Sequence, residues 1–159
     1  MGILNVTPDS FSDGAQYNQL DTALKHASQM VSNGANIIDI GGESTRPGAK
    51  TVSVKEELER VIPLVQEVKS LGVLVSVDTS KPEVMLAAAK AGADMINDVR
   101  ALTTPGALEA VAQSQLPICL MHMQGLPGTM QSNPSYSDVI NEVIEYLQQR
   151  VDICVKAGI

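Results

Sequence analysis

The sequence predicts a parallel α/β protein in which strands alternate with helices. Five short apolar runs recur along the chain, and each is followed by a segment whose apolar residues return at helical spacing. Each run also ends on polar residues, which the interior of a strand does not require. Ligands of parallel α/β proteins bind at the carboxyl ends of the strands, so these polar ends indicate a functional edge. The expected strands cover residues 3–6, 37–40, 73–77, 95–96 and 118–121.

Residue types that start or stop helices stand between these runs. Ser53 can cap a helix over residues 54–71, and Glu56 follows three residues later in the position of a capping box. Pro82 opens the next helix in its first turn, and Gly92 ends it. The other expected boundaries use residues of the same kinds, namely Asn33 and Gly34, Gly72, Pro105 and Gly106, Ser137 and Asp138, and Gly158.

Two architectures fit five βα units. A doubly wound open sheet would be complete at 159 residues, but its glycine-rich phosphate loop, G-x-G-x-x-G, does not occur in the sequence. A (β/α)8 TIM barrel takes about 250 residues. The chain starts inside a strand and stops at Ile159, after a helix-ending glycine, where a sixth strand is expected. We therefore expect the first five units of a barrel, forming one partial domain over residues 1–159 that is truncated at both ends.

Composition excludes several classes of partner. A net charge of −7 argues against non-specific binding to nucleic acid or to an anionic membrane. No apolar run approaches the roughly 20 residues that span a bilayer. Cys119 lies in an apolar run and Cys154 in a helical pattern, so we expect both to be small buried hydrophobic residues in a reducing cytosol. The expectation is a cytoplasmic protein.

The first polar loop, residues 5–14, is dense in oxygen and amide groups and holds the only phenylalanine of the chain. Turn chemistry accounts for Pro8, Asp9 and Gly14. It does not account for an exposed Phe11 between two serines, which suggests a contact for a flat ligand. A capped turn and a functional loop are both compatible with this segment.

The second polar loop, residues 41–48, contains Arg46, the only arginine before residue 60. Its glycines let the backbone approach an anion closely. The forked donors of Arg46 suit phosphate or carboxylate. A local ion pair between Arg46 and Glu43 is the alternative.

Short hydrogen-bonding side chains end two neighbouring strands, namely Asp78 on one and Asn97 and Asp98 on the next. A carboxylate with an amide beside it can read the edge of a heterocycle. Each of them could instead be a helix cap or a buried, satisfied polar group. His122 has no second His or Cys nearby and is a poor zinc candidate, so it is either a ligand-facing or a structural donor.

Taken together, these motifs resemble the dihydropteroate synthase family. Residues 5–14 and 41–48 are similar to its two signature loops, and residues 76–82, 96–98 and 120–125 fit it as well. The resemblance covers essentially the whole chain. It covers only about the first three-fifths of the family's catalytic domain, a (β/α)8 barrel.

The resemblance implies a reaction of folate biosynthesis. In it, (7,8-dihydropterin-6-yl)methyl diphosphate condenses with 4-aminobenzoate to give 7,8-dihydropteroate and diphosphate. Asn5 would help to hold a Mg2+ that bridges to the diphosphate. Asp78 and Asn97 would hydrogen-bond the pterin, and Asp13 and Asp78 would stabilise the cation formed when the C–O bond breaks. The p-aminobenzoate pocket, where sulfonamides compete, would involve the loop residues Phe11, Thr45, Arg46 and Pro47.

The resemblance also implies motifs that do not occur in these 159 residues. Members of the family carry an Asp-Pro-Gly-Phe-Gly-Phe-Gly-Lys loop, a Lys-Arg pair and an Arg-x-His segment after the fifth unit, and most are homodimers at full length. Two alternatives stay open: a catalytically inactive pterin-binding fragment, and a methyltetrahydrofolate methyltransferase-type barrel, which should lack the two signature loops.

Overall fold

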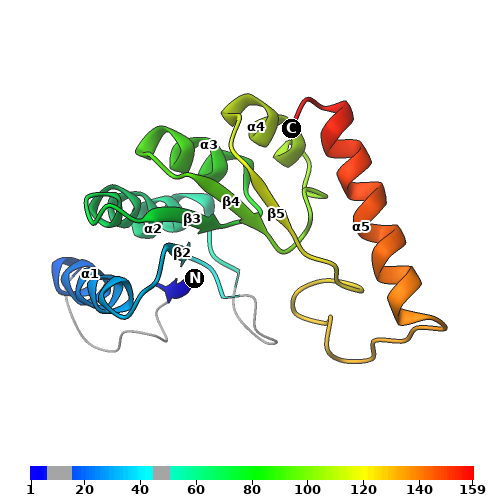
Figure 1. Cartoon of the computed structure of the whole chain (residues 1–159), viewed down its shortest axis with the longest axis horizontal. Helices are drawn as coiled ribbons and strands as arrows, with labels where there is room; N and C mark the ends of the chain where they lie inside the picture. Colours follow the sequence, from blue (N-terminus) through cyan, green and yellow to red (C-terminus); the bar gives the residue numbers. More distant parts are fainter. Residues whose placement is uncertain (7–15, 45–50) are drawn as a thin grey trace.

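The computed structural model describes residues 1–6, 16–44 and 51–159. Strands and helices alternate along this part of the chain, as the sequence predicts (Figure 1). The loop residues Phe11, Asp13, Thr45, Arg46 and Pro47 lie outside the described residues. The elements are β1 (Gly2–Asn5), α1 (Gln16–Ser32), β2 (Ile37–Gly41), α2 (Val54–Lys69), β3 (Leu74–Asp78), α3 (Pro82–Ala91), β4 (Met95–Asp98), α4 (Ala107–Ser114), β5 (Ile118–Leu120) and α5 (Val139–Lys156).

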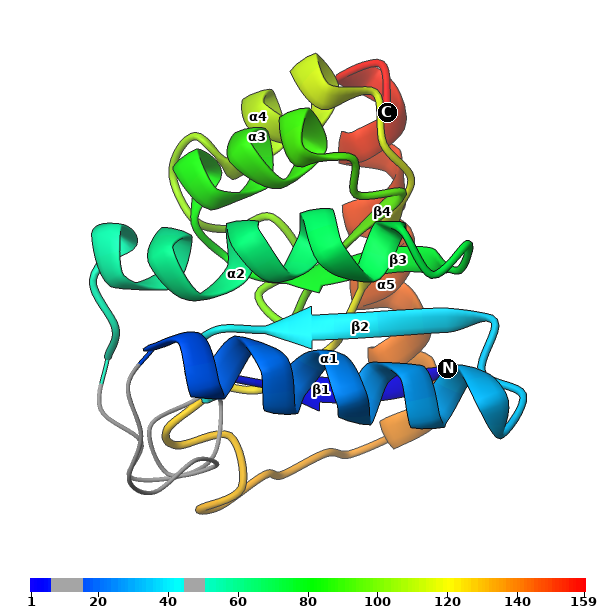
Figure 2. The ribbon, with the colours of Figure 1, turned by 90° about the vertical axis from the view of Figure 1, so that its left-hand side faces the viewer.

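The five strands form one parallel sheet in the order β1-β2-β3-β4-β5. Each new strand is added to the same edge of the sheet. Right-handed crossovers then place the connecting helices on one face, and α1 to α4 follow one another along that face (Figures 1 and 2). A doubly wound sheet would reverse its strand order and carry helices on both faces, so that alternative is wrong. The predicted run of βα units is confirmed.

The hydrophobic core lies between the sheet and helices α1 to α4. Side chains alternate along a strand, so every second residue faces these helices. The helix-facing strand residues are fully buried and form one cluster with the inner face of α2. They are Leu4, Ile38, Ile40, Val75, Val77 and Ile96, and they meet Val61, Leu64, Val65 and Val68.

The opposite face of the sheet carries a different set of side chains. Ile3 and Leu74 are 64% and 52% exposed there. Asp39 pairs with Ile3 on this face, and Ser76 pairs with Asp39. Cys119 pairs with Asn97 on this face and is exposed, so the expectation that it is buried is wrong. The alternation of β5 explains this, because only the other parity faces the helices. Cys154 is buried as expected, and both thiols are free.

Helix α2 begins with half of the expected capping box. The Ser53 hydroxyl accepts the Glu56 backbone N–H at 3.2 Å. The Glu56 carboxylate does not return to Ser53 but pairs with Arg60, one turn along the same helix. The glycine stops behave as predicted, since Gly92 ends α3 with a left-handed φ of 103°.

Helix α5 packs least closely of the helices. Cys154 is its one buried residue, while Ile140 and Ile144 are 68% and 59% exposed. Arg150 ties the helix to the β4–α4 loop by donating to the carbonyl oxygens of Ala101 at 2.7 Å and Leu102 at 3.0 Å. None of the helices in the described part of the chain has the length and apolarity needed to cross a membrane.

Candidate functional site

The carboxyl ends of four strands bring three polar side chains into one row. Asn5 pairs with Gly41, Gly41 with Asp78, and Asp78 with Asn97. Residues paired in register point to the same face of a sheet. This face is the one that α1 to α4 leave uncovered. Of the three residues whose polar ends the sequence places on adjacent strands, Asp78 and Asn97 share this face, and Asn5 joins them there.

Gly41 determines how closely this row packs. A Cβ atom at Gly41 would lie 2.9 Å from the Asn5 Oδ1 atom and 3.8 Å from the Asp78 Oδ2 atom. The first distance is too short for a carbon atom to fit without movement. Glycine therefore leaves a gap over β2, which the Asn5 amide borders from β1 and the Asp78 carboxylate borders from β3.

Asp39 lies two residues before Gly41 on the same face of β2, and sequence reasoning missed it. It is 5% exposed. Its Oδ2 atom accepts a hydrogen bond from the Asn97 Nδ2 atom at 3.1 Å. Its Oδ1 atom and the hydroxyl of Ser76, its partner in the register, are buried without a hydrogen-bond partner in the described part of the chain. A carboxylate inside the apolar run Ile-Ile-Asp-Ile was the signal that could have identified it.

Asp78 lies in an environment that disfavours its charge. Burial raises its pKa most, and the negative charges of Asp39, Asp98, Glu57 and Glu43 raise it further, to about 7. The nearby cation does not reverse this, because Lys81 is engaged by two other carboxylates. Asp78 can therefore donate or accept a proton near neutral pH.

Lys81 links the β3–α3 loop to the β2–α2 loop. Its Nζ atom contacts Glu43 Oε2 at 2.6 Å and also Glu57 Oε2. Glu57 is fully buried in α2, and its other oxygen accepts from the Thr79 hydroxyl at 2.5 Å. Burial by itself would lower the pKa of Lys81, but hydrogen bonds and charge from Glu43 and Glu57 outweigh it and raise that pKa above its ordinary value. Lys81 thus remains cationic.

The two oxygens of Glu43 already have partners among the described residues. One contacts Lys81, and the other accepts the Val52 backbone N–H at 2.9 Å. This hydrogen bond joins the two sides of the loop that contains Arg46. The Gly42 position is equally constrained, since a Cβ atom there would lie 2.7 Å from Val61 Cγ2 and 2.9 Å from Glu57 Cγ. The alternative of an ion pair between Arg46 and Glu43 concerns a residue that lies outside the described part of the chain.

Asp98 does not belong to the row, although it follows Asn97 directly. It is fully buried, and its carboxylate accepts from the Ser80 hydroxyl and from the backbone N–H groups of Arg100 at 2.9 Å and Leu102 at 2.8 Å. Asp98 is thus a buried, satisfied carboxylate that organises the β4–α4 loop. Its interpretation as a heterocycle reader is wrong, because alternation along β4 turns it away from the face of Asn97.

His122 packs among aromatic rings after β5. Its ring centroid lies 4.9 Å from that of Tyr146 in an edge-to-face arrangement and 5.8 Å from that of Tyr136. Such contacts between rings favour a structural role. Two roles were left open for His122, and the geometry supports the structural one. The His122 ring packs the β5–α5 loop against α5.

The described residues contain no group of three or more His, Cys, Asp or Glu side chains placed to hold a metal ion. Mg2+ binds differently, through one or two protein oxygens together with phosphate oxygens and water. The exposed amide oxygen of Asn5, beside Gly41, is a hard oxygen ligand of this kind. The row therefore fits a Mg2+ that is held mainly by a phosphorylated ligand.

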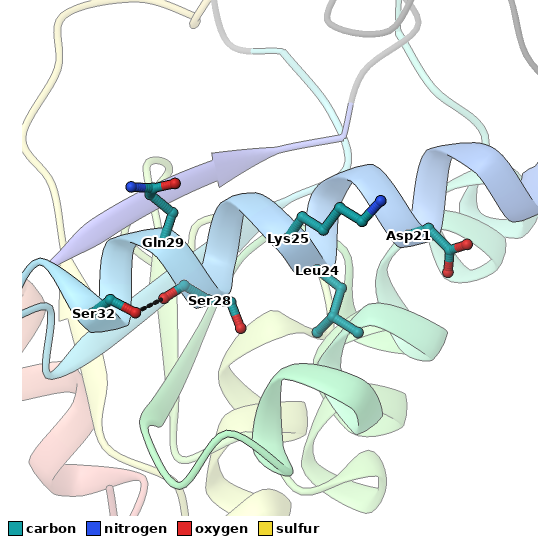
Figure 3. Close-up of a pocket in the computed structure, with 6 residues that line it drawn as sticks. All are labelled: Asp21, Leu24, Lys25, Ser28, Gln29 and Ser32. Atoms are coloured by element: carbon teal, nitrogen blue, oxygen red, sulfur yellow. Dashed lines mark hydrogen bonds between the residues drawn. The ribbon is translucent and has the colours of Figure 1, made fainter.

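A separate open hollow lies on the outer surface of α1 (Figure 3). None of the residues in the row lines it. Asp21 and Lys25 stand along this helix surface, and the Ser32 hydroxyl donates to the Ser28 carbonyl at 2.8 Å. The hollow carries no cluster of catalytic side chains, so the strand ends remain the candidate site.

Comparison with known families gives a match over the whole chain. The family described as "Pterin binding enzyme" matches residues 1–159. The chain belongs to this pterin-binding enzyme family. Its relatives include the dihydropteroate synthases of Escherichia coli (strain K12), 60% identical over 100% of this chain and 57% of that protein, and of Haemophilus influenzae, 54% identical over 100% and 58%.

Solved structures agree with this assignment. A crystal structure of the Yersinia pestis dihydropteroate synthase with a sulfonamide drug complex aligns with a TM-score of 0.92 at 57% identity, over 100% of this chain and 58% of that one. The Xanthomonas albilineans synthase with 4-aminobenzoic acid aligns with a TM-score of 0.90 at 51% identity, over 100% and 56%. The chain thus spans somewhat more than half the length of these relatives and shares their fold over that part.

The raised pKa of Asp78 predicts how stability depends on pH. The folded protein holds the Asp78 proton up to about pH 7, whereas the unfolded chain releases it near 3.8. The folded state thus binds more protons between these values, and the stability that this provides is lost as pH rises through 7.

Asp78→Asn, which cannot ionise, should be more stable than the wild type at pH 8 by roughly 1–3 kcal/mol. Thermal unfolding at pH 4 and pH 8 measures this. A gain of equal size at both pH values would contradict the assignment.

Removing the Lys81 charge should destabilise the fold strongly. Lys81→Met leaves the buried Glu57 carboxylate without a cation, which costs about 3–5 kcal/mol in the free energy of unfolding. Adding Glu57→Gln removes the second charge and should recover a large part of that loss, whereas Lys81→Arg keeps the cation and should cost less. Urea unfolding of these three variants and of Glu57→Gln alone measures these differences. Additive losses in the double variant would show that Lys81 and Glu57 are not coupled.

Proposed function

We propose that the polypeptide containing this chain is a dihydropteroate synthase, a transferase of folate biosynthesis. It would join (7,8-dihydropterin-6-yl)methyl diphosphate to 4-aminobenzoate and release diphosphate. The observation that supports this most directly is the row of Asn5, Asp78 and Asn97 at one edge of the sheet, within a family whose relatives carry this activity in their names. The row combines an oxygen ligand, a titrating carboxylate and an amide.

Asp78 and Asn97 are proposed to bind the pterin ring. They are paired in register on the adjacent strands β3 and β4, so their side chains point to the same face of the sheet. A carboxyl and an amide together match the donors and acceptors on the edge of a heterocycle. Asp78 is also proposed to act in the chemistry. A positive charge that develops on the pterin-methyl group favours the ionised form of the carboxyl, so the charge of Asp78 would stabilise the transition state as the C–O bond breaks.

Mg2+ is the proposed cofactor, with Asn5 as its protein ligand. When bound, the metal would neutralise the charge of the leaving diphosphate. Asn5 itself would orient the diphosphate end of the substrate relative to Asp78, across the gap that Gly41 leaves. The proposal is supported by the amide chemistry of Asn5 and its place at the strand end.

The arylamine is proposed to bind between the two polar loops. Phe11, Thr45, Arg46 and Pro47 would form that pocket, and Asp13 would stabilise the cation from the loop side. The sulfonamide and 4-aminobenzoic acid complexes of the Yersinia pestis and Xanthomonas albilineans relatives support this substrate and inhibitor class. Glu43, which joins both sides of the second loop, would set the position of its base.

Further properties follow as parts of the same proposal. The chain would form the first five units of a (β/α)8 barrel domain, the full-length protein would be a cytoplasmic homodimer, and it would bind neither nucleic acid nor membranes. Gel filtration of the natural polypeptide tests the dimer.

A chimera tests the proposed activity directly. Residues 1–159 replace the matching part of the Escherichia coli synthase, to which they are 60% identical, and dihydropteroate formation is measured. We expect turnover within about tenfold of the parent enzyme, a barrier difference of about 1.4 kcal/mol. The Asn97→Ala chimera is the control and should lose pterin affinity. A folded chimera that binds pterin but forms no product would reduce the role of the chain to binding.

Asp13→Ala should lower turnover far more than pterin affinity. If Asp13 stabilises the cation, its loss should reduce kcat by about 100-fold while the Kd for the pterin substrate changes little. Asp13→Asn keeps the shape and removes the charge, so it should behave in the same way. Steady-state kinetics together with calorimetric titration measure the two quantities. Equal losses in both would rule out the cation role.

A further inference from the structure

The buried carboxylate of Asp39 has no part in the reaction outlined above. Asp39 precedes Gly41 by two residues on β2, on the face of the sheet that carries Asp78 and Asn97, and it is 5% exposed. A buried carboxylate is costly unless its charge serves a purpose or is well paired. Its one hydrogen bond among the described residues is to the side-chain amide of Asn97. Asp39 and Asn97 come from β2 and β4, on either side of β3.

The chemistry of this hydrogen bond fixes the orientation of the Asn97 amide. An ionised carboxylate can only accept, so the NH2 group of Asn97, and not its carbonyl oxygen, must face Asp39. The 3.1 Å contact between Nδ2 and Oδ2 agrees with this. The Asn97 Oδ1 atom is then left for a donor from elsewhere. Without Asp39 the amide could turn over and present its NH2 group instead.

Asp39 also acts on the second pterin-facing side chain. Among the neighbouring charges that raise the pKa of Asp78, that of Asp39 has the largest effect, ahead of Asp98, Glu57 and Glu43. One buried carboxylate thus influences the polarity of an amide and the protonation of a carboxyl in the same row. These are the two groups assigned to ring recognition in the proposed function.

We propose that Asp39 is a positioning residue for pterin recognition. It holds Asn97 with the carbonyl oxygen toward the ligand, so that Asn97 reads an N–H donor on the edge of the heterocycle. This inference rests on the proposed function, because it takes a pterin as the ligand. Asp39 itself need not touch the ring. Its effect passes through Asn97 and, as a charge, through Asp78.

A double-mutant cycle tests this role in the natural polypeptide that contains residues 1–159. The variants are Asp39→Asn, Asn97→Ala and the pair, and the probe is 6-hydroxymethyl-7,8-dihydropterin in calorimetric titration. We expect Asp39→Asn to weaken binding about tenfold or more, which is about 1.4 kcal/mol. Asn97→Ala should then have little further effect in the Asp39→Asn background. Additive losses would overturn the proposal, because they would show that Asp39 does not act through Asn97.

Two further readouts separate positioning from a general structural role. Asp39→Asn removes a negative neighbour, so the pH at which binding changes should move downward with the pKa of Asp78. The 15N-resolved side-chain NH2 signal of Asn97, followed without ligand, should shift in Asp39→Asn. Asp21→Asn, an exposed charge change on α1, is the matched control and should alter neither quantity (Figure 3). An unchanged Asn97 signal in Asp39→Asn would contradict the proposal.

The outcomes distinguish this inference from the proposed function. Product formation with an additive cycle supports the synthase and overturns the role of Asp39. A coupled cycle without product formation supports Asp39 and overturns the synthase activity. A wild-type protein that binds no dihydropterin overturns both. Thermal unfolding of each variant confirms that the comparison is made between folded proteins.

Discussion

The parallel register of the sheet is the constraint on which the rest of this structure depends. Because all four strand pairs are parallel, the carboxyl ends point one way, and side chains that are paired in register share a face. A shift of one residue in β3 would exchange Asp78 for a core valine and disrupt both faces at once. The apolar residues that bury the helix side therefore also hold the polar row in place. Packing and recognition have a common cause in the strand alternation.

Negative charge is concentrated around this row, and it is compensated unevenly. Lys81 pairs with Glu43 of the β2–α2 loop and with Glu57 of α2, so it offsets one of these two negative charges. Asp39 and Asp78 receive no such partner from the described residues, and they face the side where a ligand would bind. A cationic intermediate would relieve this imbalance, because it supplies the charge that the row lacks. The arrangement is thus more favourable for a reacting substrate than for an empty site.

A large part of the fold was predictable from the sequence, because it depends on local signals. Apolar runs, Pro82 in a first helical turn and Gly92 after the last one locate elements without knowledge of the tertiary contacts. The placement of Asp78 and Asn97 at one edge followed from the rule about strand ends. Asp98 could not be assigned in this way, because adjacent residues of one strand differ in direction, and the sequence does not show which parity faces the helices.

The residues that sequence reasoning missed depend on contacts between distant segments. In the sequence, Asp39 is only a polar residue inside an apolar strand. Its partner Asn97, which donates a hydrogen bond to it, lies 58 positions later in the chain. In the sequence, Lys81 is only the residue before Pro82. Its ion pairs with Glu43 and Glu57 form only when the fold brings the three residues together. Pairing between side chains far apart in sequence leaves no periodic signal in a single chain. Such pairs can be recognised only once the fold is known.

The β4–α4 loop shows a consequence of a different kind. Ala101 and Leu102 both adopt a left-handed backbone, with φ of 51° and 57°, which is uncommon for residues other than glycine. Asp98 holds this conformation from inside the loop, and Arg150 of α5 holds the carbonyl oxygens of the same two residues from outside. The turn beside Asn97 is therefore held on both sides by hydrogen bonds within the chain. A ligand that binds beside a turn held in this way loses less free energy to ordering of the chain, and α5 contributes to this through Arg150.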